Sequence, residues 1–219
     1  VGTVRPVKGI HKKGPPVQFR GTGFIVGNGL QVITNHHVIP ETIDVENKES
    51  LAIFSGRGKQ AKVHKARLVR SDPDHDLALL EITSAPLPVM QLANSSKVRE
   101  GAEVAVTGFP IGMVLGLYPV THKGIIAAIT PIVIPAISSR SLTASQIKRM
   151  RNPFVVYQLD IVAYPGNSGS PVYNVETGEV IGVVNSVFVK GTKESALEKP
   201  SGISYAIPVK YVHDLLKKK

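Results

Sequence analysis

A serine between two glycines marks the stretch of this 219-residue sequence where residue types most clearly suggest chemistry. The stretch is residues 164–171, YPGNSGSP. Gly166 and Gly169 permit a tight turn that other residues would resist, and such a turn can aim the amide N–H groups of Gly166 and Ser168 at one point. A serine hydroxyl becomes a useful nucleophile only with a base nearby and donors for the oxyanion. This turn could supply nucleophile and donors, but the base must come from elsewhere.

Two adjacent histidines are the candidate bases. His36 and His37 follow an apolar run at 30–34 that predicts a strand. Because neighbouring residues on a strand face opposite sides, the pair is not expected to chelate one metal ion. The sequence also has no HExxH pattern and no cysteine pair to complete a zinc site. A buried structural histidine and a catalytic base remain as interpretations.

An acidic turn at 71–76 leads into the apolar run at 77–82. This order predicts that the Asp76 carboxylate lies beside the core, where it must find a donor such as an imidazole N–H. An ordinary Asp-rich turn is the alternative. We expect Asp72 and Asp74 to be surface residues of this turn.

Composition predicts an ordinary globular protein, with 42% hydrophobic and 19% charged residues. There are no cysteines, so neither disulfides nor thiolate metal sites are expected, and no cofactor is required. No apolar run reaches the roughly 18 residues of a membrane span. The chain begins at Val1 without a signal peptide, so we expect that any targeting segment has been removed.

The net charge of +10 favours acidic partners. The basic residues are scattered, however, and aromatic residues make up only 5% of the chain, without tryptophan, so no base-stacking platform is evident. A nucleic-acid-binding β-barrel is therefore an alternative that we do not favour. It would show steeply salt-dependent binding to DNA or RNA.

Many short apolar runs separated by glycine and proline turns predict an antiparallel β-barrel protein. Residues 1–20 are interpreted as an extended edge strand or loosely held arm, and 138–152 as a basic exposed loop. Helical spacing of Val209, Val212 and Leu215 predicts a short terminal helix. The expected strands are 21–26, 30–34, 50–54, 60–69, 77–82, 101–108, 118–129, 154–162, 171–174, 180–189 and 202–207.

The order His37, Asp76, Ser168 is that of the chymotrypsin arrangement, whereas subtilisins and α/β-hydrolases use other orders. Short stretches across most of the chain resemble the trypsin-like family, and most closely the protease domain of HtrA (Deg) proteases. They are GTGF at 21–24, TNHHV at 34–38, DLALL at 76–80, GFPIG at 108–112, GI at 124–125, QLD at 158–160, GNSG at 166–169 and YAIP at 205–208.

The resemblance implies an all-β fold of two six-stranded antiparallel barrels with a short C-terminal helix. It implies one domain over 1–219, with lobes at about 1–95 and 96–219. It makes His37 the base, Asp76 the orienting acid and Ser168 the nucleophile, with an oxyanion hole at Gly166, Asn167 and Ser168. The implied activity is hydrolysis of peptide bonds, in unfolded proteins, through an acyl-enzyme. A catalytically silent or resting domain that binds peptides or acts as a chaperone is the alternative.

The resemblance also implies a substrate pocket, with Val162 at its base and Val184, Asn185 and Ser186 as a wall. Since this pocket offers no carboxylate for Lys or Arg, we expect small or medium apolar side chains before the cut. The sequence departs from the family at Ser170, where the family usually has glycine, and it carries no PDZ domain. A cell-envelope or secreted location and a homotrimer follow from the resemblance alone.

Overall fold

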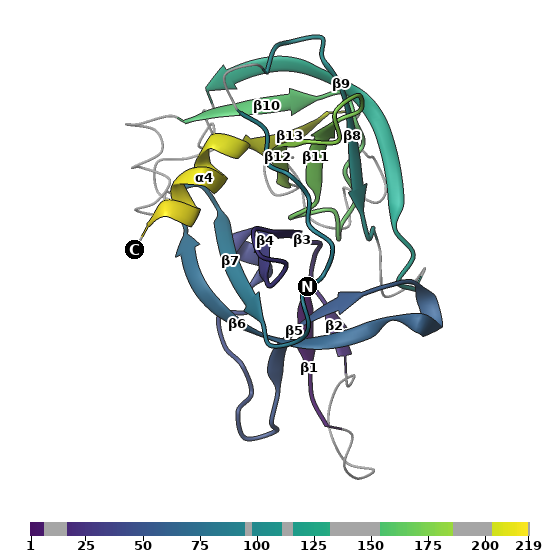
Figure 1. Cartoon of the computed structure of the whole chain (residues 1–219), viewed down its shortest axis with the longest axis vertical. Coiled ribbons are helices and arrows are strands. Elements are labelled where there is room, and N and C mark those ends of the chain that lie inside the picture. Colours follow the sequence, from purple (N-terminus) through teal and green to yellow (C-terminus); the bar gives the residue numbers. More distant parts are fainter. Residues whose placement is uncertain (7–16, 95–97, 111–115, 132–153, 186–202, 219) are drawn as a thin grey trace, which may run out of the picture.

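The computed structural model describes residues 1–6, 17–94, 98–110, 116–131, 154–185 and 203–218. The first half of the chain forms a seven-stranded antiparallel sheet in the order β2-β1-β5-β6-β7-β4-β3 (Figure 1). Two short 3-10 helices, η1 (His36–Val38) and η2 (Gly58–Gln60), interrupt it. The strands are β1 (Gly2–Val4), β2 (Val17–Phe19), β3 (Phe24–Val26), β4 (Gln31–Thr34), β5 (Ser50–Ser55), β6 (Lys62–Asp72) and β7 (Leu77–Ile82).

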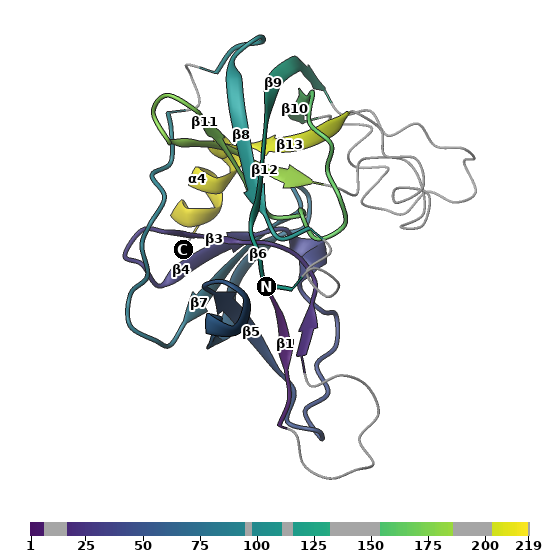
Figure 2. The same cartoon turned by 90° about the vertical axis from the view of Figure 1, so that its right-hand side faces the viewer.

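The second half forms a closed six-stranded barrel in the order β10-β13-β12-β11-β8-β9. Figure 2 shows this barrel packed on one side of the N-terminal strands. Its pairings are antiparallel throughout, as the alternation of short apolar runs and turns predicts. The strands are β8 (Glu103–Gly108), β9 (Val120–Pro131), β10 (Val155–Leu159), β11 (Pro171–Asn174), β12 (Val180–Asn185) and β13 (Ser204–Pro208).

The all-β class, the chymotrypsin-like architecture and the terminal helix are confirmed, but the N-terminal lobe differs in detail from a closed six-stranded barrel. In the described residues its edge strands β2 and β3 do not pair with each other, so the sheet is open, and the arm at residues 1–20 contributes two of its seven strands. There β1 pairs with both β2 and β5, so the arm adds a hairpin to the edge of the sheet. The basic loop predicted at 138–152 lies outside the described residues.

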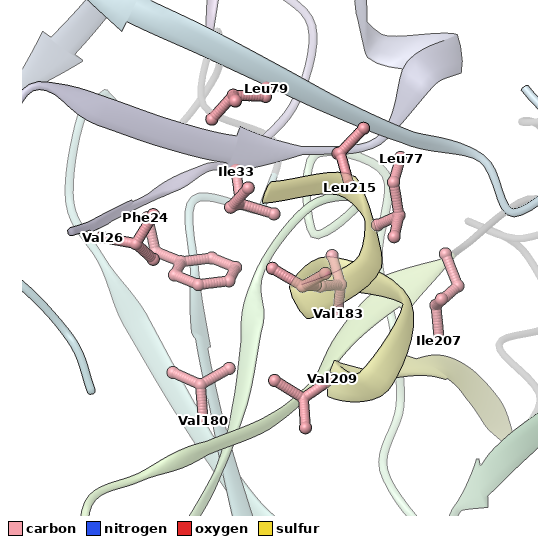
Figure 3. Close-up of a cluster of buried hydrophobic side chains, with 11 residues drawn as sticks. Phe24, Val26, Ile33, Leu77, Leu79, Val180, Val183, Ile207, Val209 and Leu215 are labelled. Atoms are coloured by element: carbon pink, nitrogen blue, oxygen red, sulfur yellow. The ribbon is translucent and has the colours of Figure 1, made fainter. Parts of the chain in front are cut away.

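A shared core joins the two halves of the molecule. Phe24, Ile33 and Leu79 from the sheet pack in one buried cluster with residues of the barrel and of helix α4 (Val209–Lys217) (Figure 3). The helix buries Val209, Val212 and Leu215, the positions that its sequence periodicity indicates. Burial of one such side chain contributes about 1.5–3 kcal/mol, so this cluster fixes the helix on both lobes.

In the part of the chain that the structure describes, none of the helices has the length and apolar character needed to cross a membrane.

Candidate active site

His37 lies in η1, the 3-10 helix that follows β4. We predicted a strand end here, but the chain turns at Asn35, and the geometric argument against a shared metal ion therefore no longer applies. Among the described residues, no group of three or more His, Asp or Glu side chains is placed to hold a metal ion. The turn brings the His37 backbone N within 2.9 Å of Asp76 Oδ1 and His37 Nδ1 within 2.6 Å of Asp76 Oδ2.

The Asp76 carboxylate accepts a third hydrogen bond, from Asn185 Nδ2 at 2.6 Å. A carboxylate only accepts, so His37 Nδ1 carries the proton and His37 Nε2 is left with a free lone pair. The Asp76 side chain is 12% exposed and that of His37 is 33% exposed. The acid is therefore enclosed while the imidazole can reach a substrate.

The backbone of Asp76 is held as firmly as its carboxylate. Its φ of +53° lies in the left-handed region, which is uncommon for residues other than glycine. Its carbonyl accepts hydrogen bonds from His36 N at 3.1 Å and Asn35 Nδ2 at 3.0 Å. Sequence reasoning missed Asn35 in this role, although an asparagine next to a candidate base was visible.

Ser168 lies in a tight turn built on two glycines with positive φ, Gly166 at +100° and Gly169 at +86°. Asn167 N donates to Tyr164 O, and Ser170 N donates to Asn167 O, both at 2.9 Å. Within the described residues, the N–H groups of Gly166 and Ser168 donate to no acceptor. Two unpaired amides of this kind can stabilise a developing oxyanion.

Hydrogen bonds from Thr22 connect the serine turn to the N-terminal lobe. Its backbone N donates to Ser168 O at 2.8 Å, and its hydroxyl donates to Gly166 O at 2.7 Å. Thr34 Oγ1 in turn donates to Thr22 O at 2.7 Å. A Cβ on Gly169 would lie only 2.2 Å from Thr22 O, so glycine is required here by both backbone angle and space.

The structure thus brings His37 and Asp76 into direct contact and places Ser168 against the lobe that carries them. No hydrogen bond joins the Ser168 hydroxyl to the His37 imidazole among the described residues. Catalytic hydrogen bonds are often long or poorly aligned in unliganded enzymes and tighten when substrate binds, so the absence of this bond does not exclude a base and its nucleophile.

The structure describes three of the four residues of the predicted substrate pocket. Val162 is half-buried beside the serine turn. Val184 is 1% exposed and packs in the barrel core, while Asn185 turns to Asp76. The pocket wall predicted at these positions stays a prediction. Ser186 lies outside the described residues.

A chymotrypsin-like fold with a histidine–aspartate pair on one lobe and a glycine-flanked serine on the other defines a class of peptidase domain. Residues 21–183 match the family model of the trypsin-like peptidase domain. The chain belongs to this family.

The relatives narrow this to the HtrA type. A probable periplasmic serine endoprotease, DegP-like, of Marinomonas sp. (strain MWYL1) is 32% identical over 203 residues, 91% of this chain and 36% of the relative. Its counterpart in Pseudomonas putida (strain GB-1) is 31% identical over 198 residues, 90% of this chain and 34% of the relative. The chain therefore spans about a third of the length of these relatives.

Solved structures agree on the fold. An HtrA-type protease, AlgW with a tripeptide, has a TM-score of 0.62 and 27% identity, covering 90% of this chain and 54% of its own. The Rv3671c protease in its inactive form has a TM-score of 0.64 and 23% identity, covering 90% and 81%.

Proposed function

We propose that this domain is a serine endopeptidase in which Ser168 is the nucleophile, His37 the general base and Asp76 the orienting acid. The observation that carries the proposal is the enclosed Asp76 carboxylate 2.6 Å from His37 Nδ1. This contact fixes the histidine tautomer that leaves Nε2 free to accept a proton. The glycine-flanked turn that carries Ser168, and the match of residues 21–183 to the trypsin-like family, support the role of Ser168.

The reaction follows from these roles. His37 Nε2 takes the proton of the Ser168 hydroxyl as its oxygen bonds to the peptide carbonyl carbon, and Asp76 stabilises the resulting imidazolium. The same proton passes to the leaving amine as the C–N bond breaks. Water, deprotonated by His37, then hydrolyses the acyl-enzyme and releases Ser168.

The amides of Gly166 and Ser168 supply the oxyanion donors, with Asn167 shaping the turn between them. Neither N–H group donates to another of the described residues, which supports this role. Loss of one such donor costs roughly 2.7–4 kcal/mol of transition-state stabilisation in acyl transfer. The turn is therefore expected to control rate more than substrate affinity.

The substrates we propose are unfolded polypeptides with small or medium apolar residues before the cut. The half-buried, uncharged Val162 supports this preference, since it offers no partner for a basic side chain. One similar HtrA-type structure was solved with a tripeptide, which agrees with peptide binding in this fold. A clear preference for arginine at this substrate position would contradict the proposal.

The location and assembly that we propose rest on the relatives. Those named above are called periplasmic, so we place this domain in the bacterial cell envelope. A homotrimer is the assembly that the HtrA resemblance favours, and its mass in solution tests that point.

The alternative is a resting or silent domain that binds peptides. The missing hydrogen bond between Ser168 and His37 is the observation in its favour. Peptide binding without turnover, even with peptide activators present, would support it.

Fluorophosphonate labelling of the wild type beside Ser168→Ala, with hydrolysis of unfolded casein in parallel, tests the function. Labelling and cleavage should both disappear in Ser168→Ala and persist in Ser170→Ala, which changes a second serine of the same turn. Casein hydrolysis that survives in Ser168→Ala would exclude Ser168 as the nucleophile.

A further inference from the structure

A second buried carboxylate lies four residues before Asp76. We expected Asp72 to be a surface turn residue, but it is only 6% exposed. Asp72 Oδ2 accepts hydrogen bonds from Lys218 Nζ at 2.9 Å and from His75 Nδ1 at 3.0 Å, and Asp72 Oδ1 accepts one from His75 N at 3.2 Å. The sequence around Asp72 gave no sign of its burial, because Lys218, one of its partners, lies 146 residues away.

His75 connects this carboxylate to helix α4. Its ring stacks on the Tyr211 ring, with centroids 4.0 Å apart and an interplanar angle of 21°. Its other neighbour is Phe154, edge-on at 5.0 Å, just before β10 of the barrel. His75, the residue immediately before Asp76, therefore contacts the helix and Phe154 on one side and Asp72 on the other.

Two basic side chains join the end of α4 to β6, one from each element. Arg70 of β6 donates to the carbonyl oxygens of Leu216 at 3.0 Å and Leu215 at 3.4 Å. Lys218, at the helix end, donates back to Asp72. Cations at a helix C-terminus satisfy its free carbonyls and complement its dipole. Figure 1 shows this end of α4 beside the end of β6.

These contacts converge on the turn that presents Asp76. One face of the turn is bound by α4 through Asp72 and His75. At its other end the Asp76 carbonyl is bound by His36 and Asn35. A left-handed φ at a residue with a side chain persists only where its surroundings fix it from several directions.

We propose that Asp72, His75 and Lys218 are positioning residues, through which helix α4 holds the turn that sets Asp76 against His37. None of them touches the reacting atoms. Their effect on catalysis rests on the proposed function. Their effect on the hydrogen bond between His37 and Asp76 does not, and it can be measured separately.

The pKa of Asp72 agrees with this arrangement. Burial opposes ionisation of the carboxyl, but the hydrogen bonds from Lys218 and His75 outweigh it and lower the pKa from 3.8 to about 2. A lowered folded-state pKa contributes stability above the unfolded-state value that is lost as pH falls through the folded one. The destabilisation caused by Lys218→Met should therefore be greatest above pH 4 and shrink as pH approaches 2.

The central experiment compares Lys218→Met with Lys217→Met. Lys217 is the adjacent residue, of the same type, and makes no ion pair in the described part of the chain. We expect Lys218→Met to lower kcat for a peptide substrate about fivefold and Asp72→Asn about tenfold, with KM within twofold of the wild type. Lys218→Arg should restore most of kcat, and Lys217→Met should leave it unchanged.

A readout at the acid–base pair separates positioning from general stability. Well below the unfolding temperature, the low-field NMR resonance of the His37 Nδ1 proton should shift or broaden in Lys218→Met and remain unchanged in Lys217→Met. A lower Tm with an unchanged resonance and unchanged kcat would mean that these residues only stabilise the fold, and it would overturn the proposal. If the wild type itself neither labels nor cleaves, the proposed function fails, while the resonance still tests the positioning.

Discussion

The Asp76 carboxylate accepts three hydrogen bonds, whereas the side chains of Asn167 and Ser170, in the same turn as Ser168, make none within the described residues. Both polar ends of Asn167 and the hydroxyl of Ser170 are buried without partners. The acid–base half of the site, His37 and Asp76, is held by side chains and backbone together, whereas the serine turn is held by backbone hydrogen bonds and by the Thr22 hydroxyl. The first half should therefore be sensitive to side-chain chemistry and the second to backbone shape.

This contrast follows from what each half must do. The histidine has to keep one tautomer while it gains and loses a proton, so its partner must be fixed and charged. The serine turn has to present amide N–H groups, which any side-chain acceptor nearby would compete for. Unpaired polar side chains are costly, and backbone packing must compensate for them.

The largest expected effect is that of Asp76→Asn. An amide beside His37 Nδ1 can stabilise the wrong tautomer and cannot stabilise an imidazolium, so kcat should fall by about 10⁴-fold. Rates of casein or peptide hydrolysis measure this, with circular dichroism to show that the variant is folded. A loss smaller than tenfold would mean that Asp76 does not orient the base.

The second prediction addresses the nucleophile half. Gly169→Ala should destabilise the protein by about 3–5 kcal/mol, because the new Cβ meets Thr22 O and Thr34 Oγ1 at a positive φ. Gly178→Ala is the matched control, since its φ of +72° is also left-handed but nothing lies within 4 Å of its Cβ.

For Gly178→Ala only the backbone term applies, roughly 1–2 kcal/mol. Urea unfolding of the two variants gives the difference between them. Equal losses would show that the serine turn can move away from Thr22, and that the nucleophile half is not fixed by packing.

The local features of this fold could be predicted from sequence, and the long-range ones could not. Gly27-Asn28-Gly29 between two apolar runs predicted the β3–β4 hairpin, and helical spacing predicted α4. The same reasoning placed Asp76 beside the core and in need of a donor. It could not foresee that Asn185, 109 residues away, would donate to the same carboxylate.

Asp72 shows most clearly which kind of contact could not be predicted from the sequence. In sequence it belongs to a polar turn, where exposure is the normal outcome. Its carboxylate is paired with Lys218 at the end of α4, 146 residues away in the sequence. Pairings of this kind depend on tertiary structure, so composition and spacing carry no trace of them.

The smallest expected effect is that of Ser170→Ala, and it tests whether the turn's own side chains add hydrogen bonds to those of Thr22. The Ser170 hydroxyl is fully buried and unpaired, so its removal should leave the free energy of unfolding unchanged or raise it by up to about 1 kcal/mol. The kcat should stay within twofold of the wild type. Ser170→Gly should instead lower the free energy of unfolding by about 1 kcal/mol, because glycine gives the unfolded chain more backbone freedom.

A loss of more than about 1 kcal/mol in Ser170→Ala would contradict this. A Cβ on Gly108 would lie near both Ser170 Oγ and Asn167 Oδ1, so these two atoms border the same buried space. A hydrogen bond between them would be the simplest cause of such a loss. The serine turn would then have a polar scaffold of its own, at the position where the family usually has glycine, and the two halves of the site would be built alike.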